Sequence, residues 1–236
     1  NLPIPVLAKA DNEANLENRL DWRWLDLRRP EHRLIFQVWT KLEEGFRSQL
    51  LSENFLQIYT PCLMNTASET GSEVFEVKYF ERKAYLSQSP QFYKQMAIAA
   101  GFEKVFMTGP VFRAEASYTS RHVTEFTGWD FEFANINSHH DIMDQEERAL
   151  ASAFTKVQEV LPGVSVPSLP FPRLTLQEVK AKLQVAGVPS EKDHDLSPEE
   201  EREICRLVKE EQGHDFVFVT DYPIAARPFY HMRHAD

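Results

Sequence analysis

The chain has little cysteine and no long hydrophobic run, and these absences exclude several classes of protein. Only two cysteines, Cys62 and Cys205, occur among 236 residues. Neither lies in a metal-ligand spacing, so the sequence indicates neither a disulfide framework nor a zinc site. No apolar run approaches the roughly 20 residues that a membrane helix needs, and the first residues lack a signal-peptide pattern. We therefore expect a cytoplasmic protein without a membrane partner.

Acidic residues outnumber basic ones, which limits the partners that the surface can attract. The net charge is −10 at neutral pH, which argues against a general nucleic-acid coat protein. Much of the excess lies in residues 190–212, where Ser197 and Glu200 predict a capping box at the start of a charged surface helix; we assign this helix no chemistry. His139 and His140 have no patterned acids or cysteines nearby, so we expect no metal site there.

The length suffices for one large domain or two small ones. The alternation of helical and strand periodicities favours an α+β fold, with an antiparallel sheet flanked by helices. Residues 1–19 are polar and contain proline, like an interdomain linker, and we place the domain at residues 20–236. Helices are predicted over residues 31–53, 90–101, 138–161, 175–186 and 198–212. Strands are predicted over residues 55–60, 73–80, 83–87, 105–114, 124–133 and 216–221.

The most informative stretch is residues 112–133, which predicts two strands joined by a polar loop. Because alternate residues of a strand point to opposite faces, one face of the second strand carries Phe126, Gly128, Asp130 and Glu132. The opposite face is apolar and requires a core. The polar face thus offers an aromatic ring, a gap without a side chain, and two carboxylates. This arrangement suits a ligand with a planar base, phosphates and an amine.

Cations gather at one end of the same hairpin. Arg113 and Glu115 share a face of the first strand, and the connecting loop carries Arg121 and His122. Guanidinium groups bind phosphate oxygens in a bidentate manner, so phosphate is the natural partner of this end. An ordinary hairpin with one buried and one solvated face has the same alternation. The cations of the loop are what favour a binding site.

Residues 87–94, with the sequence SQSPQFYK, predict a second half of the site. Ser89 has the chemistry of an N-cap and Pro90 that of a first helical residue. Gln91 and Lys94 then share a face one turn into the helix, where the helix N-terminus directs unpaired N–H groups. Lys94 can hold a small carboxylate there and Gln91 can orient it. Such residues on a first turn are, however, more often simply solvated.

Taken in order, these strings resemble the catalytic domain of a class II aminoacyl-tRNA synthetase, specifically an aspartyl-tRNA synthetase of the archaeal and eukaryotic type. The helix and strand that end in IYTP at Pro61 resemble motif 1, which builds the dimer interface in that family. FRAE with RHVTEF resembles motif 2. SQSPQFYKQM resembles the aspartate-recognising segment, and SETGSEVFEVKYF resembles the mobile loop over the amino acid and the strand after it. The resemblance spans nearly the whole chain.

The resemblance implies a role for each matching residue. Arg113 would be catalytic, because it would hold both the α-phosphate of ATP and the α-carboxylate of aspartate. The other ATP-binding residues would be Glu115 at the adenine side, Arg121 and His122 at the β- and γ-phosphates, and Phe126 stacked on adenine. The other aspartate-binding residues would be Ser89, Gln91, Lys94 at the side-chain carboxylate, Asp130 at the α-ammonium, and Glu69 from the mobile loop.

The reaction that the resemblance implies is activation of L-aspartate by ATP, with Mg²⁺, followed by transfer to tRNA(Asp) in a homodimeric enzyme. A relative that also charges tRNA(Asn) would share these motifs. No oligonucleotide-binding barrel precedes Asn1, and the sequence stops at Asp236 before motif 3. We therefore expect a piece of a longer enzyme.

Two other functions fit the same residues. One is an asparagine synthetase of the aspartyl-tRNA synthetase type, which passes activated aspartate to ammonia. The other is a non-catalytic paralogue that binds a partner, although intact Arg113, Lys94 and Asp130 argue against it. Lys94 also argues against an asparaginyl-tRNA synthetase, because a cation matches a carboxylate better than it matches an amide.

Overall fold

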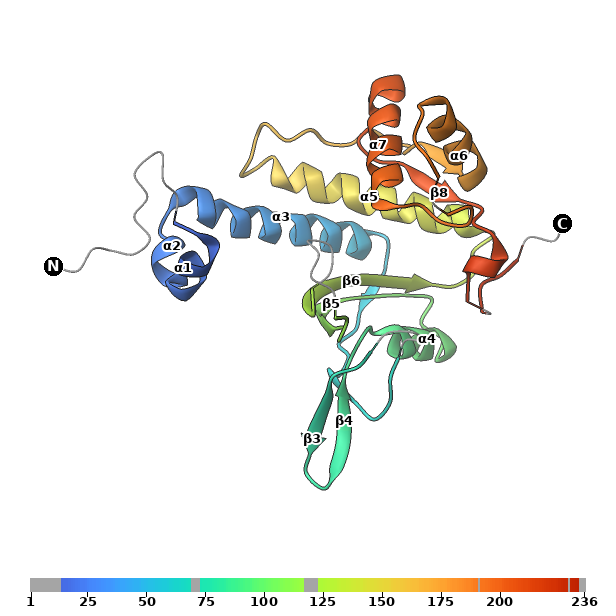
Figure 1. Ribbon diagram of the computed structural model, residues 1–236. Coiled ribbons are helices and arrows are strands. Elements are labelled where there is room, and N and C mark those ends of the chain that lie inside the picture. Colours follow the sequence, from blue (N-terminus) through green and yellow to red (C-terminus); the bar gives the residue numbers. More distant parts are fainter. Residues whose placement is uncertain (1–13, 69–72, 117–122, 191, 229, 234–236) are drawn as a thin grey trace. The chain divides into compact units, whose positions relative to one another are not determined.

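The computed structural model describes residues 14–68, 73–116, 123–190, 192–228 and 230–233, which Figure 1 traces in colour. The chain folds as two compact units. Unit 1 comprises residues 1–46 and 142–236, and unit 2 comprises residues 47–141. The division falls within two long helices, α3 (Pro30–Ser52) and α5 (His139–Val157), so each of these helices contributes residues to both units.

Unit 2 is built on two small sheets. In the first, β5 (Lys104–Phe112) pairs antiparallel with β6 (Glu125–Phe133), and β1 (Leu56–Gln57) joins the other edge of β5 in parallel. In the second, β4 (Arg82–Leu86) lies between β2 (residues 63–64) and β3 (Glu76–Tyr79) and runs antiparallel to both. Figure 1 shows β3 and β4 as a hairpin.

The core of unit 2 forms where the apolar faces of β5 and β6 meet Phe55. Val105 and Phe106 of β5 are fully buried, and Phe55 is 2% exposed. The Phe55 ring packs edge-on against Phe131 and Phe133 of β6, with centroids 6.0 and 5.7 Å apart. Aromatic pairs favour this geometry because the positive edge of one ring meets the negative face of the other. The apolar face predicted for the second strand therefore packs in a core.

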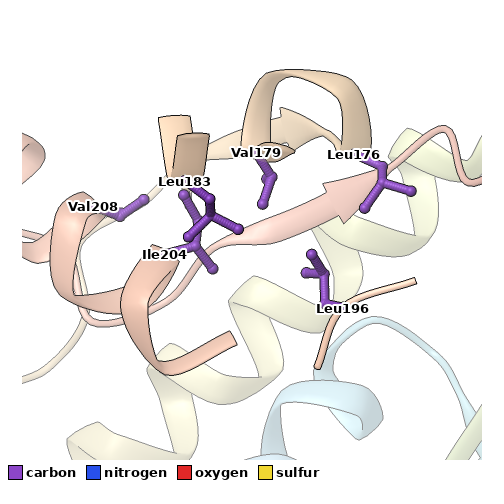
Figure 2. Close-up of a cluster of buried hydrophobic side chains, with 6 residues drawn as sticks. All are labelled: Leu176, Val179, Leu183, Leu196, Ile204 and Val208. Atoms are coloured by element: carbon purple, nitrogen blue, oxygen red, sulfur yellow. The ribbon is translucent and has the colours of Figure 1, made fainter. Parts of the chain in front are cut away.

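Unit 1 combines helices with one short parallel ladder. Besides its parts of α3 and α5, its elements are α1 (Leu16–Asp21), α2 (Arg23–Asp26), β7 (Arg173–Thr175), α6 (Leu176–Val185), α7 (Pro198–Gln212), β8 (Phe218–Thr220) and the short 3-10 helix η1 (Ile224–Ala226). β7 pairs with β8 in parallel. Figure 2 shows the buried cluster that joins α6 to α7, formed by Leu176, Val179, Leu183, Leu196, Ile204 and Val208. Removing these side chains from water is what holds the two amphipathic helices together.

Capping residues determine where α6 and α7 begin. Thr175 and Glu178 form a capping box at the start of α6, and Ser197 and Glu200 form one at the start of α7. In each box the hydroxyl accepts from a backbone N–H of the first turn while the carboxylate accepts from the N-cap N–H. α7 ends at Gly213, whose φ of 70° is left-handed and favours glycine. The predicted capping box of the charged helix is thus confirmed.

Gly45 of α3 lies against the backbone of α5. A Cβ at this position would lie 2.5 Å from Ala153 Cα and 2.5 Å from the carbonyl oxygen of Ser152. The Ser152 hydroxyl also donates a hydrogen bond to the Gly45 carbonyl at 2.9 Å. The two helices therefore approach each other at a point where only glycine fits, because any side chain would meet backbone atoms that cannot rotate away.

Asp26 is a fully buried carboxylate that ties together the N-terminal helices of unit 1. Its Oδ1 accepts from Arg19 Nε at 3.2 Å and lies 2.7 Å from His32 Nδ1, and its Oδ2 accepts from Arg23 Nη1 at 2.9 Å. Burial acts to raise the pKa of Asp26, but the hydrogen bond from Arg19 and the charges of His32 and Arg19 outweigh it and hold the pKa below 3.8. The carboxyl group of Asp26 is therefore ionised in the folded protein at neutral pH.

The α+β class and the antiparallel hairpin predicted from the sequence are confirmed, while several predicted boundaries were wrong. The strand predicted over residues 55–60 is reduced to Leu56–Gln57, because only those residues pair with β5. Pro90 is not the first helical residue. It is the N-cap of α4 (Gln91–Ala99), and its own side chain makes no capping hydrogen bond. α1 begins at Leu16, within the stretch interpreted as a linker; the linker and the domain limits stay predictions.

Candidate functional site

One face of β6 carries the side chains that the sequence predicted to be functional. Phe126 is partly exposed, Gly128 is buried, and Asp130 and Glu132 are half-buried along this face. The register with β5 places Gly109 opposite Gly128 and hydrophobic residues opposite the others. The strand therefore presents an aromatic ring at one end, two carboxylates at the other, and bare backbone between them.

Gly128 leaves room on this face for neighbouring side chains. A Cβ there would lie 3.0 Å from Asp130 Oδ2 and 3.5 Å from the methyl groups of Val111. A side chain would push against the carboxylate that follows two residues later on the same face. The absence of a side chain at Gly128 therefore gives the Asp130 carboxylate room to hold its position.

Lys94 lies at the carboxylate end of the face. Its side chain is 5% exposed, and its ammonium donates to Asp130 Oδ1 at 3.0 Å and lies 3.6 Å from Glu132 Oε2. One turn earlier on α4, Gln91 Nε2 donates to the same Glu132 oxygen at 3.2 Å. Hydrogen bonding and ion pairing satisfy a lysine that burial would otherwise destabilise. Two carboxylates around one ammonium leave this end with one net negative charge.

The segment before α4 is buried and holds the first turn in place. Ser89 is 8% exposed, and its hydroxyl oxygen accepts from the Gln91 backbone N–H at 3.3 Å. Gln88 is 1% exposed; its Oε1 accepts from Ser68 N at 3.1 Å and its Nε2 donates to the Glu73 carbonyl at 3.4 Å. Sequence reasoning missed Gln88, since nothing in the local pattern distinguishes it from a solvated glutamine.

Arg113 lies at the aromatic end of the face. Its guanidinium lies over the Phe126 ring, 5.5 Å from the centroid, a geometry in which the ring quadrupole attracts a cation. Its backbone N–H donates to the Thr124 carbonyl at 3.0 Å, which fixes the residue just beyond the hairpin ladder. Within the described residues, Arg113 Nε is buried and has no hydrogen-bond partner. A buried N–H without an acceptor costs free energy, so an anion that accepted from it would be stabilised.

Among the predicted residues, Arg113 thus lies over Phe126, Lys94 of α4 contacts Asp130 of β6, and Ser89 contacts Gln91 at the start of α4. Glu115 is half-buried just after β5. Glu69, Arg121 and His122 lie outside the described residues, and their roles stay predictions. Glu132 also contacts Lys94, although the sequence placed it on the right face without assigning it a contact.

A separate hollow of about 880 Å³ lies in unit 1, beside α6 and the loop that follows it, and none of the predicted residues lines it. The cation that lines it is Lys180. The Lys180 ammonium lies within hydrogen-bond distance of four acceptors: Ser190 Oγ, the carbonyls of Lys192 and Asp195, and Glu200 Oε1. An ammonium has three protons to donate. Lys180 is therefore saturated and has no proton left for a ligand in this hollow.

Comparison with known proteins links this geometry to a family. The profile of tRNA synthetases class II (D, K and N) matches residues 15–236. The aspartate–tRNA(Asp/Asn) ligase of Aeropyrum pernix is 39% identical over 244 residues, covering 99% of this chain and 55% of that protein. The cytoplasmic aspartate–tRNA ligase of mouse is 44% identical over 231 residues, covering 93% and 46%. The chain spans about half the length of the curated relatives it matches.

Solved structures agree on the fold. Asparaginyl-tRNA synthetase from Pyrococcus horikoshii, in complex with asparaginyl-adenylate, superposes with a TM-score of 0.82 at 34% identity and covers 94% of this chain and 52% of that one. Aspartyl-tRNA synthetase from Entamoeba histolytica superposes with a TM-score of 0.77 at 33% identity, covering 97% and 45%. The backbone of this chain thus follows that of both enzymes over almost its whole length.

Proposed function

This chain belongs to the tRNA synthetases class II (D, K and N) family, and from that premise we propose that the enzyme containing it activates L-aspartate with ATP and transfers the aspartyl group to tRNA(Asp). The observation that carries the proposal is the arrangement along β6. An arginine whose Nε has no acceptor among the described residues lies at one end of the strand face, and a buried lysine flanked by carboxylates lies at the other.

The length of the face suits an aminoacyl-adenylate. Phe126 and Asp130 are four residues apart, which corresponds to about 13 Å along a strand. We place adenine against Phe126, the α-phosphate at Arg113, and the amino acid at the end that carries Asp130 and Lys94. The P. horikoshii relative was solved with asparaginyl-adenylate, a ligand of the same shape. Glu115, Arg121 and His122 would complete the ATP site, and Glu69 the amino-acid site.

The charges at the amino-acid end favour aspartate. Asp130 would accept from the α-ammonium of the substrate, while Lys94 would pair with the side-chain carboxylate. Ser89 and Gln91 would supply the remaining polar contacts. An ammonium pairs well with a carboxylate and only weakly with an amide oxygen, so Lys94 selects aspartate over asparagine. The curated relatives from A. pernix and mouse, both named as aspartate ligases, support this choice.

The proposed chemistry needs positioning and charge neutralisation more than proton transfer. An oxygen of the aspartate α-carboxylate, ionised at neutral pH, attacks the α-phosphorus of ATP. The bond from that phosphorus to the bridging oxygen breaks, and pyrophosphate leaves with the electron pair. Arg113 would offset the charge that develops on the α-phosphate oxygens. A ribose hydroxyl of the terminal adenosine of the tRNA then attacks the activated carbonyl, and AMP leaves.

Mg²⁺ would accompany ATP and offset charge on its phosphates. Among the residues that the structure describes, no group of three or more His, Cys, Asp or Glu side chains could hold a metal ion. We therefore assign no residue of this chain to the ion and route no step through it.

We also propose that the enzyme is a cytoplasmic homodimer that meets its partner through the motif 1 region. Ile35, Phe36 and Trp39 of α3 are 57%, 40% and 47% exposed, and Trp22 and Trp24 are exposed nearby in sequence. So many exposed large apolar side chains are typical of an interaction surface. The relatives from mouse and Dictyostelium discoideum are named as cytoplasmic enzymes. None of the described helices is long and apolar enough to cross a membrane.

The test is aspartate-dependent exchange of pyrophosphate into ATP by the full-length enzyme carrying Arg113→Ala. We expect the rate to fall by about 10²-fold or more, because the donor that offsets charge on the reacting phosphate is lost. Arg113→Lys keeps the charge but loses the planar fork, so its rate should lie in between. Arg82→Ala, at an exposed arginine of β4, is the matched control and should leave the rate unchanged.

Normal exchange by Arg113→Ala would overturn the assignment of Arg113. Product analysis separates the alternatives: aspartyl-tRNA formed with tRNA supports the proposal, whereas asparagine formed with ammonia supports the synthetase that uses ammonia. The absence of any aspartate-dependent exchange in the wild-type enzyme would indicate a non-catalytic paralogue.

A further inference from the structure

Glu132 contacts two of the residues that the proposed function assigns to the amino acid, Gln91 and Lys94. Its Oε2 accepts from Gln91 Nε2 at 3.2 Å and lies 3.6 Å from the Lys94 ammonium. Its side chain is 29% exposed, and its place near the end of β6 fixes its direction through the pairing of residue 132 with Val105. The backbone of Glu132 is therefore anchored by the β5–β6 ladder, and its carboxylate reaches two side chains of α4.

The contact with Gln91 has only one chemically allowed orientation. An ionised carboxylate accepts hydrogen bonds and cannot donate them, so the amide NH₂ of Gln91 must face Glu132. The carbonyl oxygen Oε1 of Gln91 must then point away from Glu132. Without Glu132, either end of the amide can turn toward the substrate, and an NH₂ group there would repel the substrate ammonium.

The contact with Lys94 restrains the ammonium in a similar way. One of its three protons is donated to Asp130, 3.0 Å away, and the negative charge of Glu132, 3.6 Å away, attracts a second. The third proton then remains for a ligand. Two carboxylates at different angles hold an ammonium more firmly than one does, because the torsions of the lysine chain are restrained in two directions.

We propose that Glu132 is a positioning residue for amino-acid recognition: it turns the Gln91 carbonyl oxygen toward the substrate ammonium and sets the direction of the free Lys94 proton. The inference rests on the proposed function and deepens it. Glu132 itself does not touch the substrate. It acts through Gln91 and Lys94, so its loss weakens aspartate binding and leaves the ATP half of the site intact.

The negative charge of Glu132 acts on aspartate binding in the direction opposite to its positioning role. The two roles therefore predict different results for the same substitution. Glu132 lies near the place where a substrate carboxylate would bind, so removing its negative charge would by itself strengthen aspartate binding. A purely electrostatic role therefore predicts a lower KM for aspartate in Glu132→Gln. The positioning role predicts a higher KM, because glutamine can also donate and no longer dictates the orientation of Gln91.

The experiment measures KM for aspartate, KM for ATP and kcat in pyrophosphate exchange by the full-length enzyme. For Glu132→Gln we expect KM for aspartate to rise about tenfold, the equivalent of one lost hydrogen bond, while KM for ATP and kcat change less than threefold. In a Gln91→Ala background the same substitution should have a smaller effect, because the residue through which it acts is gone. Glu76→Gln, at an exposed carboxylate of β3, is the control.

Each result is decisive. An unchanged or lower KM for aspartate in Glu132→Gln overturns the positioning role, as does an equal effect with and without Gln91. A fall in kcat with unchanged KM for aspartate also overturns it, and urea unfolding of the variant identifies a merely structural loss. The wild-type enzyme separates the two levels of inference: if it shows no aspartate-dependent exchange, the proposed function fails, whereas normal wild-type exchange with an unaffected variant refutes this inference alone.

Discussion

Replacing Lys94 by methionine tests the buried ion pair at the carboxylate end of the β6 face. The substitution keeps a similar length of apolar chain and removes one charge. Asp130 and Glu132 would then face each other without the ammonium that lies 3.0 Å from one and 3.6 Å from the other. The prediction concerns folding stability, so it holds whether or not the proposed function is right.

The magnitude follows from burial and distance. Two unit charges at 3.0 Å attract by about 5 kcal/mol at an effective dielectric constant of about 20, and the desolvation of Lys94 offsets part of that. Removing one member of a buried pair usually costs about 3–5 kcal/mol. Asp130 and Glu132 are 27% and 29% exposed, so water partly replaces the lost ammonium. We expect a loss of about 2 kcal/mol in the free energy of unfolding.

The assay is urea unfolding of the wild-type protein and the variant at pH 7. The matched control is Lys83→Met on β4, where the side chain is 70% exposed and pairs with exposed Glu76. That control should leave the urea midpoint unchanged. An equal loss for Lys94→Met and Lys83→Met would refute the reasoning.

Two further substitutions test unit 1. Asp26→Asn should lower the free energy of unfolding by about 2 kcal/mol at neutral pH, because buried His32 and the partly exposed Arg19 and Arg23 lose their anion. The folded pKa of Asp26 lies below 3.8, so its contribution is present above that value and disappears as pH falls through the folded pKa. The difference from wild type in urea unfolding should therefore vanish only in acid. A difference that disappears near pH 6 would contradict this account. Trp39→Glu on the exposed face of α3 should convert the proposed dimer to a monomer in sedimentation, while Gln37→Glu, also exposed on α3, should not; a dimer retained by Trp39→Glu would exclude that face.

Much of the local structure could be read from the sequence because short-range rules decide it. Hydroxyl and carboxylate groups three residues apart predict the capping box at Ser197, and period-2 alternation separates the two faces of β6. Boundaries were less accurate. Residues 58–60 have strand character, yet only Leu56 and Gln57 pair with β5, because ladder formation depends on a neighbour that the local pattern does not contain.

The motifs by themselves determined the family resemblance, the α+β class, and which side chains share the polar face of β6, since these depend on residue types at fixed short spacings. Only the tertiary structure decided which partners those side chains meet. Glu132 contacts Gln91 across 41 residues of sequence, and Gly45 meets α5 across 107. No local periodicity encodes such distances. They arise when packing of α4 on the hairpin, and of α3 on α5, brings remote segments within hydrogen-bond reach.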